Sequence, residues 1–160
     1  KLREHTSILT NKHDFSIYEM EKTSRQGRHK KNYSAQFDYD TKIAHLNKKI
    51  LTFEEPIYDP INIIYYMREN LNNLNQVFSF NVISKNNFKT IMMNVIGEEV
   101  IAFNNHEYNC IIIGPNNTDK LQNEDEIKIW ITKDEQKLPL IIEKKAKFGI
   151  IKMKLKDYEK

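Results

Sequence analysis

The chain has little of what marks disulfide-rich, fibrous or low-complexity proteins. Its 160 residues include one cysteine, Cys110, which excludes an intramolecular disulfide and any multi-cysteine metal site. Four glycines and four prolines are too few for a loop-dominated chain. No apolar run approaches the roughly 20 residues that a membrane-spanning helix needs. These absences leave a globular protein of ordinary composition.

The composition is that of a folded chain. Hydrophobic residues make up 39% and charged residues 29% of the sequence, a balance typical of folded rather than disordered proteins. The length favours a single domain, 1–160, with enough chain for a core. The net charge of +3 is too small to indicate nucleic acid by itself. Because the chain starts at Lys1 without a signal-like segment, we interpret it as a mature product, a trimmed form or a fragment.

Residues 58–71 carry the pattern of a capped helix. Asp59 is a suitable N-cap, and Pro60 suits the first helical position, where its missing N–H costs nothing. Apolar residues follow at helical spacing and predict a broad buried face. This face comprises Ile61, Ile63, Ile64, Tyr65, Tyr66, Met67 and Leu71.

The width of this apolar face suggests that part of it borders a cavity. We expect Ile61, Ile64 and Tyr65 to face a sheet. Tyr66 and Met67 should border whatever opening exists, because a tyrosine at a rim can bury its ring and keep its hydroxyl wet. Methionine adapts its shape to apolar ligands, which fits the same position.

Outside the helix, the hydrophobic pattern has a period of two and predicts β-strands. We expect about nine short strands in a curved antiparallel sheet, an incomplete barrel, with the one central helix packed against it. The clearest strands are 13–21, 33–39, 77–84, 88–96, 100–103, 126–132 and 148–155. Turns are expected at 23–31, 85–87 and 114–117, and Gly97 marks a turn or a bulge.

The strand at 126–132 alternates most clearly. Ile127, Ile129 and Ile131 share one face and should form the closed core. Trp130 then lies on the opposite face, where we expect it to be accessible and to have tyrosine or phenylalanine neighbours.

No residue pattern indicates catalysis or metal binding. The five histidines lack the i,i+4 and i,i+2 spacings of common metal sites. Cys110 lies in an apolar run, where an inert core thiol is the expected outcome. The acidic groups at 98–99, 124–126 and 134–135 fall at expected turns, where carboxylates are solvated. The sequence therefore predicts no enzyme, no cofactor and no metal.

The basic residues form two groups. The first, Arg25–Lys31, precedes Tyr33, Phe37 and Tyr39, a mixture that nucleic-acid-binding sheets use. A solvated hairpin tip is favoured instead, because acidic residues are interspersed along the chain. The second group consists of lysines near the C-terminus, which protect an edge strand from aggregation.

Several motifs together resemble a known family. Residues 59–68 resemble the D-P-x-S/x-x-x-Y-x-x-R helix of the exported bacterial proteins called domain of unknown function 3108. Residues 129–134, 138–140 and 148–155 resemble that family's closing W-x-S-x-D, P and G…L strands. Gly27-Arg28 and Phe37-Asp38 match its middle hairpin. The family usually has further strands before the position of Lys1, so the resemblance implies a domain that lacks the family's first strands.

The resemblance implies a periplasmic or exported bacterial envelope protein with no established activity. The closing strands are also similar to those of periplasmic lipoprotein carriers, which have an apolar concavity under a helical lid. We therefore expect a non-enzymatic protein that binds a lipid, an acyl chain or a hydrophobic segment of an envelope protein partner.

The candidate ligand-binding residues are Tyr65, Tyr66, Met67 and Trp130. Two alternatives stay open at this stage. One is a structural or interaction scaffold without a cavity, and the other is a nucleic-acid-binding module that uses the tip at Arg25–Lys31.

Overall fold

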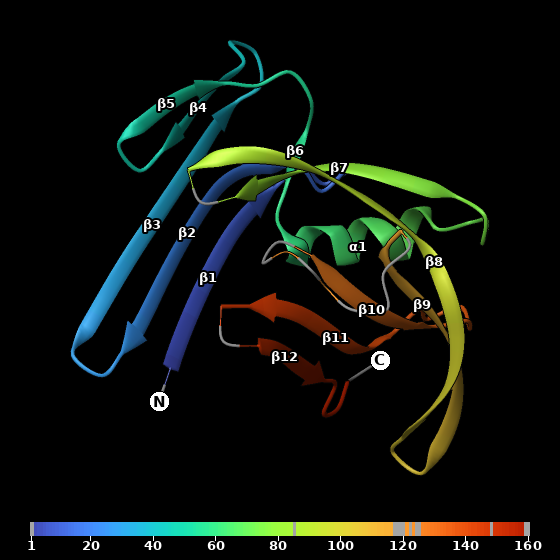
Figure 1. Ribbon diagram of the computed structural model, residues 1–160. Coiled ribbons are helices and arrows are strands. Elements are labelled where there is room, and N and C mark those ends of the chain that lie inside the picture. The colour runs from blue at the N-terminus through green and yellow to red at the C-terminus, as the bar shows by residue number, and fades with distance from the viewer. Residues whose placement is uncertain are drawn as a thin grey trace. The chain divides into compact units, whose positions relative to one another are not determined.

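The computed structural model describes residues 2–84, 86–116, 121, 123, 126–147 and 149–158, and it contains twelve strands and one helix (Figure 1). The first strands are β1 (Leu2–Thr10), β2 (Ile17–Gln26), β3 (His29–Asp38), β4 (Ile43–Leu46), β5 (Lys49–Thr52) and β6 (Ile57–Tyr58). After the helix α1 (Pro60–Asn70) come β7 (Val77–Ser84), β8 (Asn87–Phe103), β9 (His106–Pro115), β10 (Ile127–Thr132), β11 (Pro139–Ala146) and β12 (Gly149–Lys154).

The strands belong to two sheets. The five-stranded sheet has the order β1-β2-β3-β4-β5 and is antiparallel throughout. The seven-stranded sheet has the order β12-β11-β10-β9-β8-β7-β6, in which β6 and β7 are parallel. The predicted mainly β fold with one helix and no closed barrel is confirmed. The described strands form two sheets rather than one, and they number twelve rather than about nine.

Contacts divide the chain into two compact units. The first unit comprises residues 1–62 and 81–89, and the second comprises residues 63–80 and 90–160. β7 and β8 each contribute residues to both units. The prediction of one domain spanning 1–160 stays a prediction.

The first unit is organised by the long hairpin of β2 and β3 (Figure 1). Gln26 pairs with His29, so the turn is only Gly27-Arg28, shorter than the predicted turn at 23–31. Gly27 has a φ of +58°, which a glycine adopts without steric cost. One face of the sheet buries an apolar cluster that includes Ile17, Met20, Ala35, Phe37, Leu46 and Phe53.

The predicted strand at 13–21 begins later than expected. Phe15 has a φ of +58° and lies in a loop, where the Asp14 carboxylate accepts hydrogen bonds from the amide and the hydroxyl of Ser16. The pairing of β1 with β2 shifts register once at this end. As a result Ile17 and Met20 are both buried, although three positions separate them. Strict alternation could not predict that arrangement.

The helix has the predicted cap and a different buried stripe. The backbone N–H of Ile61 donates to the Asp59 carboxylate over 2.9 Å, as expected of an N-cap. Ile63 and Met67 are fully buried, one turn apart, and Ile64 is buried beside them. The prediction that Ile61 and Tyr65 face a sheet is wrong, because they are 47% and 51% exposed.

In the second unit, β8 and β9 form a long bent hairpin (Figure 1). β8 joins the two predicted strands 88–96 and 100–103, because Gly97 lies at a bulge rather than at a turn. The turn predicted at 114–117 begins too early, because β9 continues through Gly114 and Pro115. Lys85, Asn117, Glu124, Asp125 and Phe148 lie outside the described residues, so the parts of the predicted turns, acidic group and strand that fall on them are not placed.

β10 is buried on both faces. Ile127, Ile129 and Ile131 are buried, as predicted for core positions. Trp130 lies in a separate cluster with Leu140 and Ile141, and this cluster contacts Phe103, Tyr108 and Tyr158. Aromatic residues therefore pack against the cluster to which Trp130 belongs. The predicted accessibility is wrong, because Trp130 is only 7% exposed. Leu155 and Tyr158, which follow β12, pack against this cluster.

Candidate functional site

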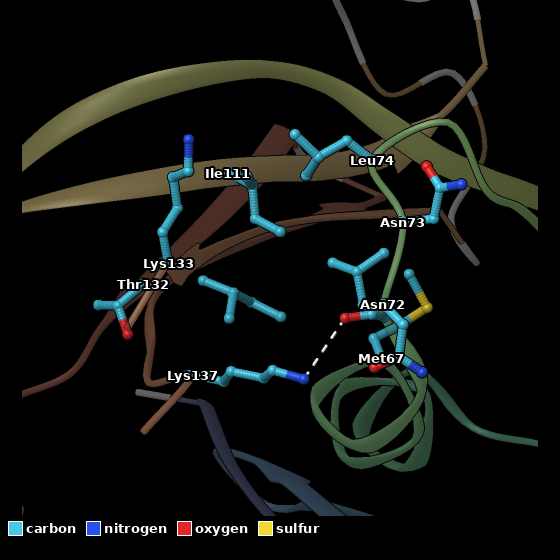
Figure 2. Close-up of a pocket in the computed structure, with 10 residues that line it drawn as sticks. Met67, Asn72, Asn73, Leu74, Ile111, Thr132, Lys133 and Lys137 are labelled. Carbon is cyan, nitrogen blue, oxygen red and sulfur yellow. Dashed lines mark hydrogen bonds between the residues drawn. The ribbon is translucent and has the colours of Figure 1, made fainter. Parts of the chain in front are cut away.

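A pocket of about 240 Å³ lies in the second unit, where α1 ends (Figure 2). Its walls come from the last helical turn and the segment after it, from β9 and β10, and from the turn that follows β10. Four of the lining residues are apolar and buried: Met67, Leu71, Ile111 and Ile131. The interior of the pocket is therefore suited to an apolar group.

The rim of the pocket is polar. Asn72, Asn73 and Lys133 are exposed residues of the lining, and Lys137 is half-buried. Leu74 adds an exposed apolar side chain to the same rim. An apolar interior with a polar, partly basic rim suits a ligand that has one apolar and one polar end.

Thr132 fixes the turn that follows β10. Its hydroxyl donates to the Asp134 carboxylate over 2.6 Å and accepts from the backbone N–H of Leu138 over 2.8 Å. The backbone N–H of Lys137 donates to the same carboxylate over 3.2 Å. Lys137 adopts a φ of +46°, which an L-residue rarely takes unless its surroundings impose it. The turn is therefore held in one conformation by its own hydrogen bonds.

Arg68 connects this turn to the helix. Its Nε donates to the Lys137 carbonyl over 2.9 Å, and its Nη2 donates to the Gln136 carbonyl over 3.1 Å. In the opposite direction, Lys137 Nζ donates to the Leu71 carbonyl over 3.4 Å. A cation near the last carbonyls of a helix also interacts favourably with the helix dipole. These three bonds join the two walls between which the pocket opens.

The size of the pocket limits what it can hold. A dry cavity of about 150 Å³ holds a benzene ring, and sites for drug-sized ligands measure about 300–1,000 Å³. At about 240 Å³ the pocket falls between these values. It can take one aromatic ring or a short acyl segment, but it cannot enclose a whole lipid.

Of the four predicted ligand-binding residues, only Met67 lines the pocket. Tyr65 is exposed on the helix surface. Tyr66 packs edge-on against Phe78 and Phe80, with ring centroids 6.1 Å and 5.3 Å away, so its predicted place at an opening is wrong for this pocket. Trp130 belongs to the cluster with Leu140 and Ile141 and does not line the pocket. The structure therefore does not bring the four residues together.

Sequence reasoning missed most of the lining. Leu71 and Ile131 were part of the periodic patterns, but nothing in the patterns placed them at a cavity rather than in the core. Ile111 lies within a continuous apolar run that gave no such indication either. Lys137 gave no signal, because its position depends on a turn and on a bond to Arg68 from a distant segment.

The surroundings of Trp130 offer no catalytic pair. Its indole N–H donates to the Glu99 carboxylate over 2.7 Å, and Lys152 Nζ lies 5.3 Å from the ring centroid. Glu98 and Glu99 lie within β8 rather than at the predicted turn. Cys110 is fully buried, as predicted, and burial raises the pKa of its thiol to about 11. A thiol with that pKa is inert at neutral pH.

The described residues contain no group of three or more His, Cys, Asp and Glu that could hold a metal ion. The described part of the chain has no helix with both the length and the apolar character to cross a membrane. A second pocket, of about 190 Å³, lies in the first unit and is lined mostly by polar residues such as Glu21, Thr23 and Asn47. It lacks the apolar interior of the pocket beside the helix.

Comparison with known proteins identifies a family. A family model described as "Protein of unknown function (DUF3108)" matches residues 1–156. No curated protein and no solved structure gives a significant match. The family resemblance read from the sequence motifs is thereby confirmed, while the similarity to lipoprotein carriers stays a prediction.

Proposed function

Because the chain belongs to the DUF3108 family, whose function is unknown, we propose its function from the pocket at the end of α1. The protein is a non-enzymatic binding protein that accepts an apolar group, either a short acyl segment or an apolar side chain of a partner. The observation that carries this proposal is the pocket of about 240 Å³ with its four buried apolar lining residues.

The way the pocket is held supports a binding role. Its two walls are joined by the bonds of Arg68 and Lys137, so the opening does not depend on a loose loop. A preformed site loses little conformational entropy when the ligand enters. Burial of apolar ligand surface contributes about 25 cal/mol per Å², so the apolar part of the ligand supplies most of the favourable binding free energy.

The proposal places the protein in the bacterial envelope, in the periplasm or exported. Support comes from the resemblance to exported proteins of the family. Immunoblotting of cell fractions from the bacterium that makes the protein tests this part, and signal confined to the cytoplasmic fraction would contradict it.

The binding role can be tested with a neutral apolar probe. Toluene, whose single ring fits a pocket of this size, should bind with one saturable Kd in a calorimetric titration. Leu74→Trp places a large ring at the rim and should weaken binding at least about tenfold. Val77→Trp is the matched control, because Val77 is similarly exposed and does not line the pocket.

The two variants distinguish binding in the pocket from nonspecific binding to the protein surface. Equal probe binding by both tryptophan variants would place the probe elsewhere on the surface. If the unmodified protein binds no probe, the binding role is excluded and the structural or interaction scaffold takes its place.

A further inference from the structure

We propose that the natural ligand of this pocket is an anionic amphiphile, a medium-chain carboxylate in its simplest form, and that Lys137 selects its acidic end. The inference rests on the proposed function, because it concerns the same pocket. It adds the charge of the ligand and the residue that recognises it.

The charges of the lining favour an anion. Two of the ten residues that line the pocket are lysines, and none is acidic. Lys133 is already paired, because its Nζ lies 3.0 Å from the Glu98 carboxylate. Lys137 has no carboxylate partner for its ammonium among the described residues, and its one bond there goes to the uncharged Leu71 carbonyl. The uncompensated positive charge at the rim is therefore that of Lys137.

The Lys137 ammonium is also positioned before a ligand arrives. An ammonium has three donors, and the Leu71 carbonyl takes one of them, which leaves two for a ligand. Arg68 holds the backbone of Lys137, and the bond to Leu71 holds the tip of its side chain. When a carboxylate binds here, little side-chain entropy of Lys137 is lost, because its ammonium is already held in place.

The two lysines differ in direction as well as in pairing. Figure 2 shows the Lys137 side chain running toward the helix, with its ammonium at the edge of the pocket. The Lys133 side chain points away from the pocket. Lys133 therefore serves as an internal control for a nearby positive charge that does not recognise the ligand.

The helix end determines where the carboxylate lies. The last carbonyls of a helix carry partial negative charge, which repels an anion. Because the Lys137 ammonium donates a hydrogen bond to the Leu71 carbonyl at this end, its positive charge offsets the repulsion between the carbonyls and the anion. The acyl part then points toward Met67 and Ile131, and the acid remains at the wet rim.

The test compares octanoate, octanol and octylammonium, which share one chain and differ in the charge of the head. Calorimetric titration of the unmodified protein should give octanoate a Kd about fivefold lower than that of octanol, the ratio expected for a partly exposed ion pair. Octylammonium should bind more weakly than octanol, because it meets a like charge. Raising the salt concentration should reduce the preference for octanoate.

Three variants assign the preference to one residue. Lys137→Gln should bring the octanoate-to-octanol affinity ratio close to one. This ratio is the readout, because any loosening of the wall on loss of the bond to Leu71 changes both affinities alike. Lys137→Arg, which keeps the charge, should retain a preference, and Lys133→Gln should retain the full preference.

The outcomes separate this inference from the function on which it rests. Equal binding of octanoate and octanol by the unmodified protein would overturn the anion preference and leave the apolar site standing. A preference that disappears in Lys133→Gln instead would overturn the assignment to Lys137. No binding of any of the three compounds would overturn the proposed function together with the inference.

Discussion

The hydroxyl of Tyr33 is buried and has no hydrogen-bond partner among the described residues. The ring packs at the edge of the first unit's core. Burying a hydroxyl costs desolvation free energy, and without a hydrogen-bond partner nothing offsets this cost. The same burial raises the pKa of Tyr33 to about 12. At this residue the fold therefore disfavours both the polar group and its ionised form.

Tyr33→Phe should leave the free energy of unfolding at pH 7 unchanged or raise it by up to about 1 kcal/mol, because it removes the unpaired hydroxyl. The pKa of Tyr33 is higher in the folded than in the unfolded chain, so its contribution is complete below pH 10 and is lost as the pH rises from 10 to about 12. Urea melts at pH 8 and pH 11 should show a smaller alkaline loss for the variant. An equal loss in both proteins would contradict the raised pKa.

At the scale of elements, α1 depends on its first and last turns. Asp59 caps the start, and Arg68 ties the end to the turn after β10. The helix has only 11 residues, which is marginal for a helix that must stand alone. Its stability must therefore come from these end contacts and from its buried stripe.

Asp59→Ala should lower the free energy of unfolding by about 1 kcal/mol, because the first turn loses its capping acceptor. Asp59→Asn keeps an acceptor of the same shape and should cost only a few tenths of a kcal/mol. Urea melts followed by circular dichroism measure both variants. An alanine variant as stable as the unmodified protein would show that this cap contributes nothing.

Arg68→Met should cost about 2 kcal/mol, because two backbone carbonyls lose charge-assisted hydrogen bonds while the apolar stem of the side chain is kept. Arg68→Lys should recover only part of this, since an ammonium lacks the planar fork of donors. The loss should appear in urea melts and also as weaker probe binding, because Arg68 holds a wall of the pocket. Loss of stability with unchanged probe binding would show that Arg68 does not hold the wall of the pocket.

Sequence patterns predicted those elements whose signals are local. The helix was predicted because its cap, its first-turn proline and its apolar spacing all lie within one segment. The start of β2 was missed, since Phe15 has a positive φ that alternation cannot reveal. The buried face of α1 was rotated in the prediction, because an apolar stripe this wide does not say which part of it is covered.

At the scale of the whole molecule, the family motifs have structural roles. Asp59 caps the helix, Arg68 holds a turn, and Trp130 bonds to Glu99. None of these three residues lines the pocket, which is why the motifs did not reveal the candidate ligand site. The pocket is assembled from segments far apart in the sequence, and only Met67 among its lining residues was predicted as a candidate.

The most direct test of the account is methyl NMR of the protein titrated with octanoate. The methyl signals of Met67, Leu71, Ile111 and Ile131 should shift together with one saturable Kd, because these residues line the pocket. Leu140 and Ile141 belong to the Trp130 cluster and should stay unchanged. Shifts confined to Leu140 and Ile141, or no shift at millimolar octanoate, would contradict the claim that this pocket is the binding site.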